Sequence, residues 1–245
     1  MAPLQSFDES ALTPATTPSA TEWQPSLVLP ARILALPSPL SFFCILRFLK
    51  TQKRTGWLDK GIANAETISD HMYRMAVMCL LAGDQPGLEG VALDAQKCAI
   101  IAIVHDLAEA IVGDLTPCDQ VPQDEKHRRE RISMLFLSDL IRPHNPRGAE
   151  ILYESYIAYE TGSSPEARFV KEIDKFEFIL QSAEYLDDIA HGGEVKADGL
   201  DEFYNSSDAR KKIKTPVIKT WLSQLDETFA TTKSFATLAE ANGSK

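Results

Sequence analysis

The chain has 245 residues, of which 44% are hydrophobic, and this suits one domain with a full core, with or without a tail. Its formal net charge of -10 repels phosphate backbones, so the composition disfavours general nucleic-acid binding. A small phosphorylated substrate could still bind, provided that a local cation offsets this field.

The targeting and redox features of the sequence indicate an intracellular protein. No apolar run reaches the roughly 18 residues that a membrane span needs. Residues 1–23 carry acids but no Arg or Lys, unlike a signal or transit peptide. The cysteines Cys44, Cys79, Cys98 and Cys118 form no CxxC pair, which favours free thiols in a reducing compartment. We therefore expect a cytoplasmic location, with a nuclear presence left open.

Residues 1–37 are rich in Ser, Thr and Pro, most clearly in the stretch TPATTPSAT. Such a composition buries little apolar surface, so we predict a disordered or loosely packed tail. Within this tail the patch LVLPARILALP is more apolar and could instead pack on the domain. We place the folded domain at residues 38–228 and a C-terminal tail at residues 229–245.

From residue 38 onward the apolar residues recur with helical spacing nearly throughout, and no run alternates as a strand would. The predicted fold class is therefore all-α, a bundle of about six or seven helices. The predicted helices cover residues 41–50, 69–82, 95–113, 122–141, 147–161, 165–190 and 207–228. The apolar face of the last helix could pack within the chain or form a dimer, through Val217, Ile218, Trp221 and Leu225.

Two adjacent polar residues, His105 and Asp106, interrupt the most apolar predicted helix, in the stretch IIAIVHDLAEAIVG. Burying an ionised carboxylate without a partner costs on the order of several kcal/mol, and a cation offsets that cost. Glu109 lies four residues after His105 and on the same helical face, so one buried helix presents three candidate ligands or bases. The alternative is a core histidine that bonds a backbone carbonyl, with Asp106 in a salt bridge.

Two further polar residues lie in other amphipathic helices, His71 in TISDHMYRMAVMCLLA and Asp174 in FVKEIDKFEFIL. Each alone is ambiguous, because His71 could belong to a capping cluster and Asp174 could pair with a neighbouring lysine. Together, two His and two Asp on three helices make up the donor set of a metal site. Imidazole and carboxylate donors suit Mn, Fe, Co, Ni or Zn, and suit Mg less well.

The same residues carry a family resemblance. The order His, then His-Asp, then a distant Asp resembles the HD-domain phosphohydrolases, with 34 residues from His71 to His105 and 68 from Asp106 to Asp174. The segments SDHMYRMAVM, IAIVHDLAEAIVGDLTP, EKHRRE and YETGSSPEARFVKEIDKFEFILQSAEY resemble the eukaryotic branch of the HD-domain 5′-deoxynucleotidases. The resemblance covers about residues 42–190 and implies a helical HD-domain bundle.

The resemblance implies a role for each residue that matches the family's motifs. The metal is a divalent cation, namely Mn, Co, Fe, Zn or Mg. The matching residues are His71, His105, Asp106 and Asp174 for the metal, Glu109 and Asp114 for catalysis, and Asp114, Leu115, Thr116 and Pro117 for the substrate. Glu109 would take the proton of the attacking water. Asp114 would either bind the sugar or protonate the leaving 5′-oxygen, and these alternatives stay open.

In the segment KRTGW, Arg54 and Trp57 look like the family's phosphate-orienting Arg and sugar-contacting Trp. Two residues separate them here, whereas bacterial relatives have them adjacent, so Lys53 is a rival to Arg54. Arg54 would hold the phosphate through a bidentate fork. Trp57 would offer an apolar wall against which a ribose 2′-hydroxyl loses its water without gaining a partner. The alternative is that Trp57 plugs the junction between helices.

We therefore predict an enzyme that hydrolyses deoxynucleoside 5′-monophosphates in a metal-dependent reaction. The alternatives are an HD-domain phosphohydrolase of nucleoside triphosphates or cyclic nucleotides, and a non-catalytic nucleotide or metal sensor. A triphosphate site would need more Arg and Lys near the metal, and a sensor would have a damaged set of ligands. Lys126 and His127 in EKHRRE could reach the phosphate, although a solvated helix face is the simpler interpretation. By analogy with relatives we expect a homodimer.

Overall fold

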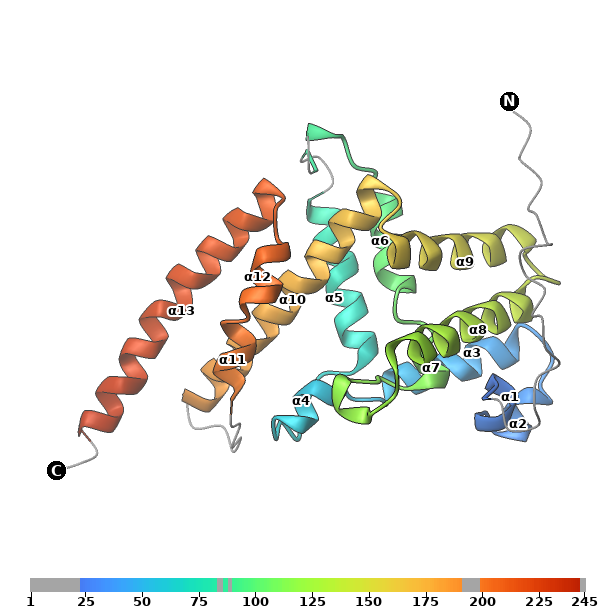
Figure 1. The fold of residues 1–245 in the computed structure, drawn as a ribbon, viewed down its shortest axis with the longest axis horizontal. Coiled ribbons are helices and arrows are strands. Elements are labelled where there is room, and N and C mark those ends of the chain that lie inside the picture. The colour runs from blue at the N-terminus through green and yellow to red at the C-terminus, as the bar shows by residue number, and fades with distance from the viewer. Residues whose placement is uncertain (1–22, 83–85, 88–89, 191–198, 243–245) are drawn as a thin grey trace.

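The computed structural model describes residues 23–82, 86–87, 90–190 and 199–242, and these residues form helices joined by short connections (Figure 1). Within these ranges no β-strand occurs, and the only β-type pairs are the isolated bridges Lys53–Thr67 and Pro86–Ala92. The predicted all-α fold class is thus confirmed. Among the described residues, no helix is both long and apolar enough to cross a membrane.

The helices are more numerous than the sequence pattern predicts, because two predicted helices are divided by turns and several short helices lie outside the predicted ranges. In chain order they are α1 (Pro25–Val28), α2 (Ala31–Leu34), α3 (Leu40–Leu46), the 3-10 helix η2 (Arg47–Lys50), α4 (Thr55–Asp59), α5 (Ile68–Leu81), α6 (Ala95–Val104), α7 (Glu109–Val112), the 3-10 helix η4 (Pro117–Asp119), α8 (Gln123–Ile141), α9 (Pro146–Thr161), α10 (Pro165–Ala190), α11 (Leu200–Tyr204), α12 (Ser207–Lys212) and α13 (Pro216–Asn242).

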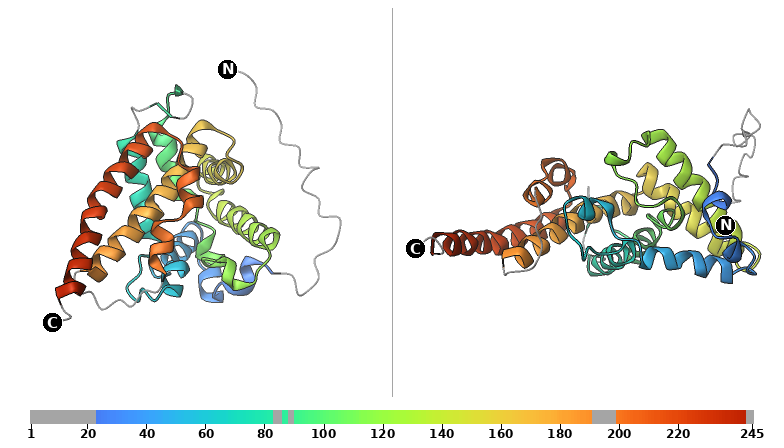
Figure 2. Two further views of the ribbon diagram at one scale, coloured as in Figure 1. Left: turned by 60° about the vertical axis from the view of Figure 1, so that its left-hand side comes forward. Right: turned by 90° about the horizontal axis from the view of Figure 1, so that it is seen from below.

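Helix α10 is the central element of the bundle. It contacts α5, α6, α9, α11, α12 and α13, and Figures 1 and 2 show α13 along one outer edge, beyond α10. One apolar core forms where α5, α6, α10 and α13 meet, around the buried residues Met75, Ile101, Ile173 and Ile218. Residues on α10 are therefore held by neighbours from most of the chain.

A capping box fixes the start of α5. The Thr67 hydroxyl accepts a hydrogen bond from the Asp70 backbone N–H (3.2 Å), and the Asp70 carboxylate accepts one from the Thr67 backbone N–H (2.8 Å). These reciprocal bonds satisfy backbone donors that a helix start leaves unpaired. The cap sets the first turn of α5, and it thereby places His71 at a defined position on that turn.

The helix predicted over residues 95–113 is divided, and this corrects the sequence prediction. Helix α6 ends at Val104, and residues 105–108 form turns before α7 begins at Glu109. The Glu109 N–H bonds the carbonyl of Asp106 (3.0 Å), three residues back, instead of a carbonyl four residues back. Because such bonds tighten the chain, His105 and Asp106 lie at a bend and not within a straight helix.

The predicted helix 207–228 is also two helices, α12 and α13, separated by residues 213–215. The Glu172 carboxylate of α10 accepts hydrogen bonds from the backbone N–H groups of Lys214 (2.6 Å) and Thr215 (2.7 Å), which anchors this break. Ile218 is fully buried, and Trp221 lies against Phe176 with ring centroids 5.7 Å apart. The apolar face of α13 therefore packs within the chain, and α13 continues to Asn242.

A second apolar core joins α3, α7, α8 and α9, and the N-terminal segment packs on it. Leu29 is buried there, while Trp23 and Ile33 pack against the same cluster. Helix α1 contacts α7 and α8, and α2 contacts α3. Residues 23–37 thus lie on the bundle, as the apolar patch LVLPARILALP allowed, whereas residues 1–22 of the predicted tail lie outside the described residues.

This packing predicts that the N-terminal segment contributes to stability. We expect Leu29→Ala to lower the free energy of unfolding by about 2 kcal/mol or more, because it removes a buried side chain and leaves a cavity. Leu27→Ala is the matched control, since Leu27 is 66% exposed and Leu29 only 7%. The control should change stability by less than about 0.5 kcal/mol. Urea denaturation measures both, and equal effects would contradict the packing.

Candidate metal centre

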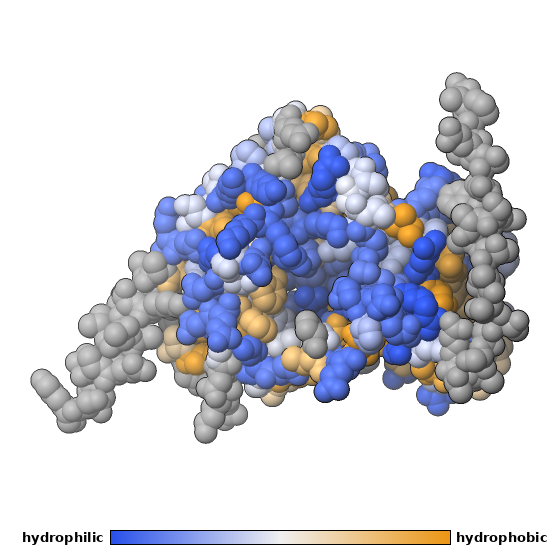
Figure 3. Space-filling view, viewed as in Figure 1, coloured by the Kyte–Doolittle hydropathy of each residue, from blue (hydrophilic) through white to orange (hydrophobic). Residues whose placement is uncertain are grey.

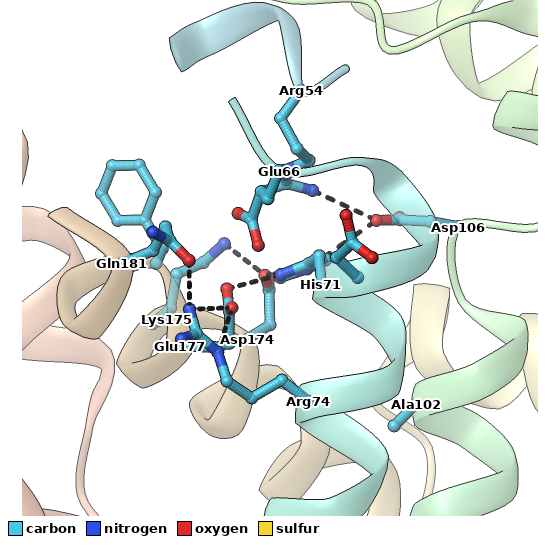
Figure 4. Close-up of polar contacts among 12 residues, drawn as sticks. Arg54, Glu66, His71, Arg74, Ala102, Asp106, Asp174, Lys175, Glu177 and Gln181 are labelled. Atoms are coloured by element: carbon cyan, nitrogen blue, oxygen red, sulfur yellow. Dashed lines mark hydrogen bonds and ion pairs between the residues drawn. The ribbon is translucent and has the colours of Figure 1, made fainter. Parts of the chain in front are cut away.

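Four predicted ligands converge from three parts of the chain. His71 comes from α5, His105 and Asp106 from the bend after α6, and Asp174 from α10 (Figure 4). Donor atoms of His71, His105 and Asp106 lie within 4.8 Å of one another. Asp174 joins them, because its Oδ1 lies 3.5 Å from Nε2 of His71. Residues up to 103 positions apart in the sequence thus surround one small space.

Both imidazole rings are oriented toward this space by a hydrogen bond at their other nitrogen. Nδ1 of His71 donates to the Glu177 carboxylate (2.5 Å), and Nδ1 of His105 donates to the backbone carbonyl of Ala102 (2.8 Å). Each ring therefore presents Nε2 to the centre. Nε2 of His105 lies 3.0 Å from Oδ2 of Asp106, and Nε2 of His71 lies 3.9 Å from the same atom. This arrangement is typical of metal-ligating histidines.

A partly buried ionic network holds Glu177 in place behind His71. The guanidinium of Arg74 donates to Oε1 of Glu177 from Nε (2.9 Å) and Nη2 (2.6 Å), and a third bond reaches Glu184 (2.6 Å). Burial lowers the pKa of His71, but the carboxylates of Glu177 and Asp174 outweigh it and raise that pKa to about 9. The negative field at His71 is therefore strong enough to hold a positive charge there.

The residues present fit a divalent metal ion. Nε2 of His71 is buried and has no hydrogen-bond partner within the described residues, although two carboxylates lie 3.5 and 3.9 Å away. A buried nitrogen without a partner is costly, and a metal ion between it and the carboxylates would satisfy all three groups. Glu66 and Glu177 form a second possible metal-binding group with His71. The His71 Nδ1 on that side already donates a hydrogen bond to Glu177.

Asp174 is held ionised by Lys175, a neighbouring lysine of the kind that the sequence offers as its partner, and it also bonds Tyr159, which the sequence pattern did not single out. Its Oδ2 accepts hydrogen bonds from the Tyr159 hydroxyl (2.9 Å) and from Nζ of Lys175 (2.8 Å). Burial opposes ionisation, but Lys175 and His71 overcome it and hold the pKa of Asp174 well below its usual range. Oδ2 is thus occupied, which leaves Oδ1 directed toward His71.

The candidate metal centre opens into a polar pocket of about 450 Å³. Figure 3 shows hydrophilic residues around a hollow near the centre of this face of the molecule. The lining combines predicted site residues with residues from α8, α10 and α12. It consists of Arg54, His105, Asp106, Glu109, Asp114, Leu115, Thr116, Lys126, Asp174, Lys175, Phe178, Ser206, Asp208, Ala209 and Lys212.

Glu109 and Asp114, the predicted catalytic residues, both line this pocket. Glu109 is buried, and its Oε2 has no hydrogen-bond partner among the residues that the structure describes. Burial together with Asp106 and Asp114 raises its pKa well above the usual value. Asp114 follows Gly113, whose φ of 88° permits the turn that ends α7. The Asp114 carboxylate accepts a hydrogen bond from the backbone N–H of Thr55 (2.7 Å), which ties the two sides of the pocket together.

The structure favours Arg54 over Lys53 as the cation of the pocket. Arg54 lines the pocket, and its Nη1 lies 3.4 Å from Oδ2 of Asp106. Burial lowers the pKa of Arg54, but Asp106 and Asp114 outweigh it and raise that pKa. Nζ of Lys53 donates instead to the backbone carbonyl of Ala65, away from the pocket lining.

Trp57 does not form the expected wall of the pocket, and this corrects the prediction. Its side chain is 2% exposed and stacks on Phe178, with ring centroids 5.2 Å apart. Its indole N–H donates to the Glu66 carboxylate (2.9 Å). Trp57 therefore plugs the helix junction, the alternative that the sequence left open. Phe178 lines the pocket in its place.

Of the three residues after Asp114 that the resemblance implies for the substrate, the first two line the pocket. Leu115 and Thr116 line the pocket, and Pro117 begins η4. Lys126 also lines it, and its Nζ donates to the Leu115 carbonyl (2.7 Å). His127 is exposed and hydrogen-bonds Gln123 (2.9 Å), so only the first of the two basic candidates in EKHRRE faces the pocket.

Comparison with known proteins identifies the family. The HD domain profile matches residues 46–215, which include all four candidate ligands. The chain belongs to the HD-domain family. The resemblance drawn from the His, His-Asp and Asp order is thereby confirmed.

Relatives of known sequence and a similar solved structure agree with that assignment. It is 40% identical over 212 residues to 5′-deoxynucleotidase YBR242W of Saccharomyces cerevisiae, covering 84% of this chain and 83% of the relative. It is 41% identical over 189 residues to human 5′-deoxynucleotidase HDDC2, covering 77% and 85%. The solved structure of HD domain-containing protein YGK1 superposes with a TM-score of 0.60 and 31% identity, covering 85% of this chain and 98% of that one.

The hydrogen bond behind His71 generates a testable prediction. We expect Glu177→Gln to weaken binding of a divalent metal ion by about 10- to 100-fold, because the amide no longer orients His71 or increases its basicity. Glu184→Gln is the matched control, since Glu184 also bonds Arg74 but does not contact His71. Titration of metal-free protein with Mn²⁺ measures both affinities. An unchanged affinity in Glu177→Gln would show that this bond does not position the ring.

Proposed function

We propose that this protein hydrolyses deoxynucleoside 5′-monophosphates to deoxynucleosides and phosphate. The observation that carries the proposal is the convergence of two imidazoles and two carboxylates on a pocket that also presents Arg54. Curated relatives about 40% identical over most of the chain carry the name 5′-deoxynucleotidase, which supports the same reaction.

His71, His105, Asp106 and Asp174 would hold the divalent ion. When bound, the ion supplies positive charge that stabilises the phosphate oxygens and lowers the pKa of a water molecule. Other residues of the chain set the tautomers and the charge of these ligands. Glu177 and the Ala102 carbonyl set the two imidazole tautomers, while Lys175 and Tyr159 hold Asp174 ionised.

The remaining pocket residues divide the work on the phosphomonoester. Arg54 can replace its long contact with Asp106 by a bidentate contact to two phosphate oxygens. Glu109, buried beside Asp106, accepts the proton of the attacking water. Asp114, which is held by the backbone N–H of Thr55, either binds the sugar or protonates the leaving 5′-oxygen.

The preference for a deoxy sugar is now assigned to Phe178 instead of Trp57. Phe178 lines the pocket and is backed by Trp57, which stacks on it. An aromatic ring offers no hydrogen-bond acceptor of comparable strength to water. A ribose 2′-hydroxyl against it would be desolvated without a partner, whereas a deoxyribose would not.

Other parts of the prediction stay proposals. A homodimer is supported by exposed apolar side chains on the adjacent helices α5 and α6: Tyr73, Leu80, Leu81 and Ile103. Exposed apolar groups that gather on neighbouring helices are typical of interfaces. The choice among Mn, Co, Fe, Zn and Mg, the lack of a nucleic-acid partner and a cytoplasmic location likewise remain predictions.

The proton acceptor is tested with an isosteric substitution. We expect Glu109→Gln to retain the metal ion and to lower kcat by at least about 100-fold, the usual size of a general-base effect. Glu130→Gln is the control, because Glu130 is also buried but does not line the pocket. Metal analysis and phosphate release distinguish the outcomes. Loss of metal would make Glu109 a ligand, and unchanged kcat would assign the proton to another group, with Asp114 next.

The substrate is tested by phosphate release from a panel of nucleotides. We expect deoxynucleoside 5′-monophosphates to react about 5- to 150-fold faster than ribonucleoside 5′-monophosphates, from roughly 1–3 kcal/mol of lost hydrogen bonding. Arg54→Ala should lower both rates alike, because both substrates carry the same phosphate. Lys53→Ala, one residue away, is the control and should leave both rates within about twofold.

Two results of this panel would contradict the proposal. Equal rates on the two sugars would remove the deoxynucleotidase assignment while leaving a metal-dependent HD hydrolase. Faster release from triphosphates or cyclic nucleotides would favour the alternative HD-domain activities.

A further inference from the structure

A second cavity of about 550 Å³ adjoins the candidate metal centre and has Asp174 on its lining. Its volume lies within the range of about 300–1,000 Å³ that is typical of small-molecule sites. The two cavities share Asp174, Lys175 and Lys212 on their linings. The second one is lined by a concentration of basic side chains, hereafter the basic pocket: Arg168, Lys171, Lys175, Lys211, Lys212 and Lys214.

The basic residues come from two facing walls. Arg168, Lys171 and Lys175 follow one another at spacings of three and four residues, and therefore share a face of α10. Lys212 and Lys214 lie at the end of α12 and in the connection that follows it. Basic residues in the last turn of α12 interact favourably with the helix dipole. This interaction does not explain the cations on α10.

Most of these cations have no carboxylate partner within the described residues. Lys175 pairs with Asp174, but the other five form no ion pair, and Lys171 lies only against the Tyr159 ring, 4.3 Å from its centroid. Burial lowers the pKa of Lys171; the carboxylates of Glu160 and Asp174 oppose this shift, and the charges of Lys175 and Lys212 add to it.

The two acidic residues on the lining, Glu172 and Asp174, interact with other groups. The Glu172 carboxylate accepts hydrogen bonds from the backbone N–H groups of Lys214 and Thr215, and Asp174 belongs to the candidate metal centre. Within the described residues, neither acid forms an ion pair with any of these five cations. Such a concentration is unexpected in a chain with a net charge of -10, because an acidic surface does not attract anions in general.

We propose that the basic pocket binds an oligophosphate chain, either free or as the phosphate tail of a nucleoside triphosphate, at a site that adjoins the hydrolytic one. Several cations on two walls match an anion with several charges along its length better than they match a single phosphate. The proposal does not depend on the hydrolytic activity, which takes place around Arg54 and Glu109.

The test is calorimetric titration of the metal-loaded protein with inorganic tripolyphosphate, in a fixed excess of Mg²⁺ so that chelation is the same for every variant. We expect Lys171→Ser/Lys211→Ser/Lys214→Ser to bind at least about tenfold more weakly than the natural chain, from three lost ion pairs. Should this variant fail to fold, Lys211→Ser/Lys214→Ser, at two exposed positions, replaces it with a smaller loss in the same direction.

Two controls separate a specific site from its alternatives. Arg32→Ser/Lys50→Ser/Lys219→Ser removes the same charge at exposed positions outside the pocket and should keep the affinity within about twofold. Arg54→Ala should also keep it, because Arg54 belongs to the hydrolytic pocket alone. An equal loss in the surface control, a loss only in Arg54→Ala, or no binding by the natural chain at about 1 mM would each overturn the proposal.

The source of the phosphate chain is identified by a parallel titration with ATP. Tighter binding of ATP than of tripolyphosphate, lost in the same lysine variant, assigns the site to a nucleoside triphosphate. Equal binding, lost in the same variant, assigns it to the phosphate chain alone. Deoxynucleotide hydrolysis is measured separately on each variant, so a failure of the proposed activity is not confused with a failure of this site.

Discussion

The central constraint on this structure is that several ionised carboxylates lie beside buried histidines inside an apolar bundle. Asp106 and Asp174 face His71 at 3.9 and 3.5 Å, and a third carboxylate, Glu177, lies behind the same ring. Such a concentration of negative charge is stable only with positive charge inside it. Arg54 and Lys175 supply part of that charge. A divalent ion at Nε2 of His71 would supply the rest, which explains why catalytic and stabilising roles coincide here.

The four candidate ligands can be picked out from the sequence because a polar residue in an apolar helix is visible without any tertiary information. His105 and Asp106 stood out in this way, and the structure brings them to His71 and Asp174. The residues that orient the ligands were harder to find. Nothing in the sequence pattern indicates that Glu177 and Arg74 form an ion pair, and only the packing of α5 on α10 brings them together.

The differences between the predicted and observed structure have physical causes that the spacing of apolar residues does not reveal. The division at His105 arises from hydrogen bonds that span three residues, while the apolar pattern continues through it into α7. Trp57 follows a glycine in a short segment, and nothing in that segment indicates the aromatic cluster that encloses it with Phe178 and Tyr185. Likewise, the cations of the basic pocket are scattered from residue 168 to residue 214, and only the fold gathers them.

The central claim is that one divalent ion binds between α5, the bend after α6, and α10. The most direct test is a crystal structure of the protein loaded with Mn²⁺ or Co²⁺, with the ion located by its anomalous scattering. We predict one ion within about 2.0–2.6 Å of Nε2 of His71, Nε2 of His105, and carboxylate oxygens of Asp106 and Asp174. An ion on the opposite side of His71, between Glu66 and Glu177, or an Asp174 side chain directed away from the ion, would contradict the account.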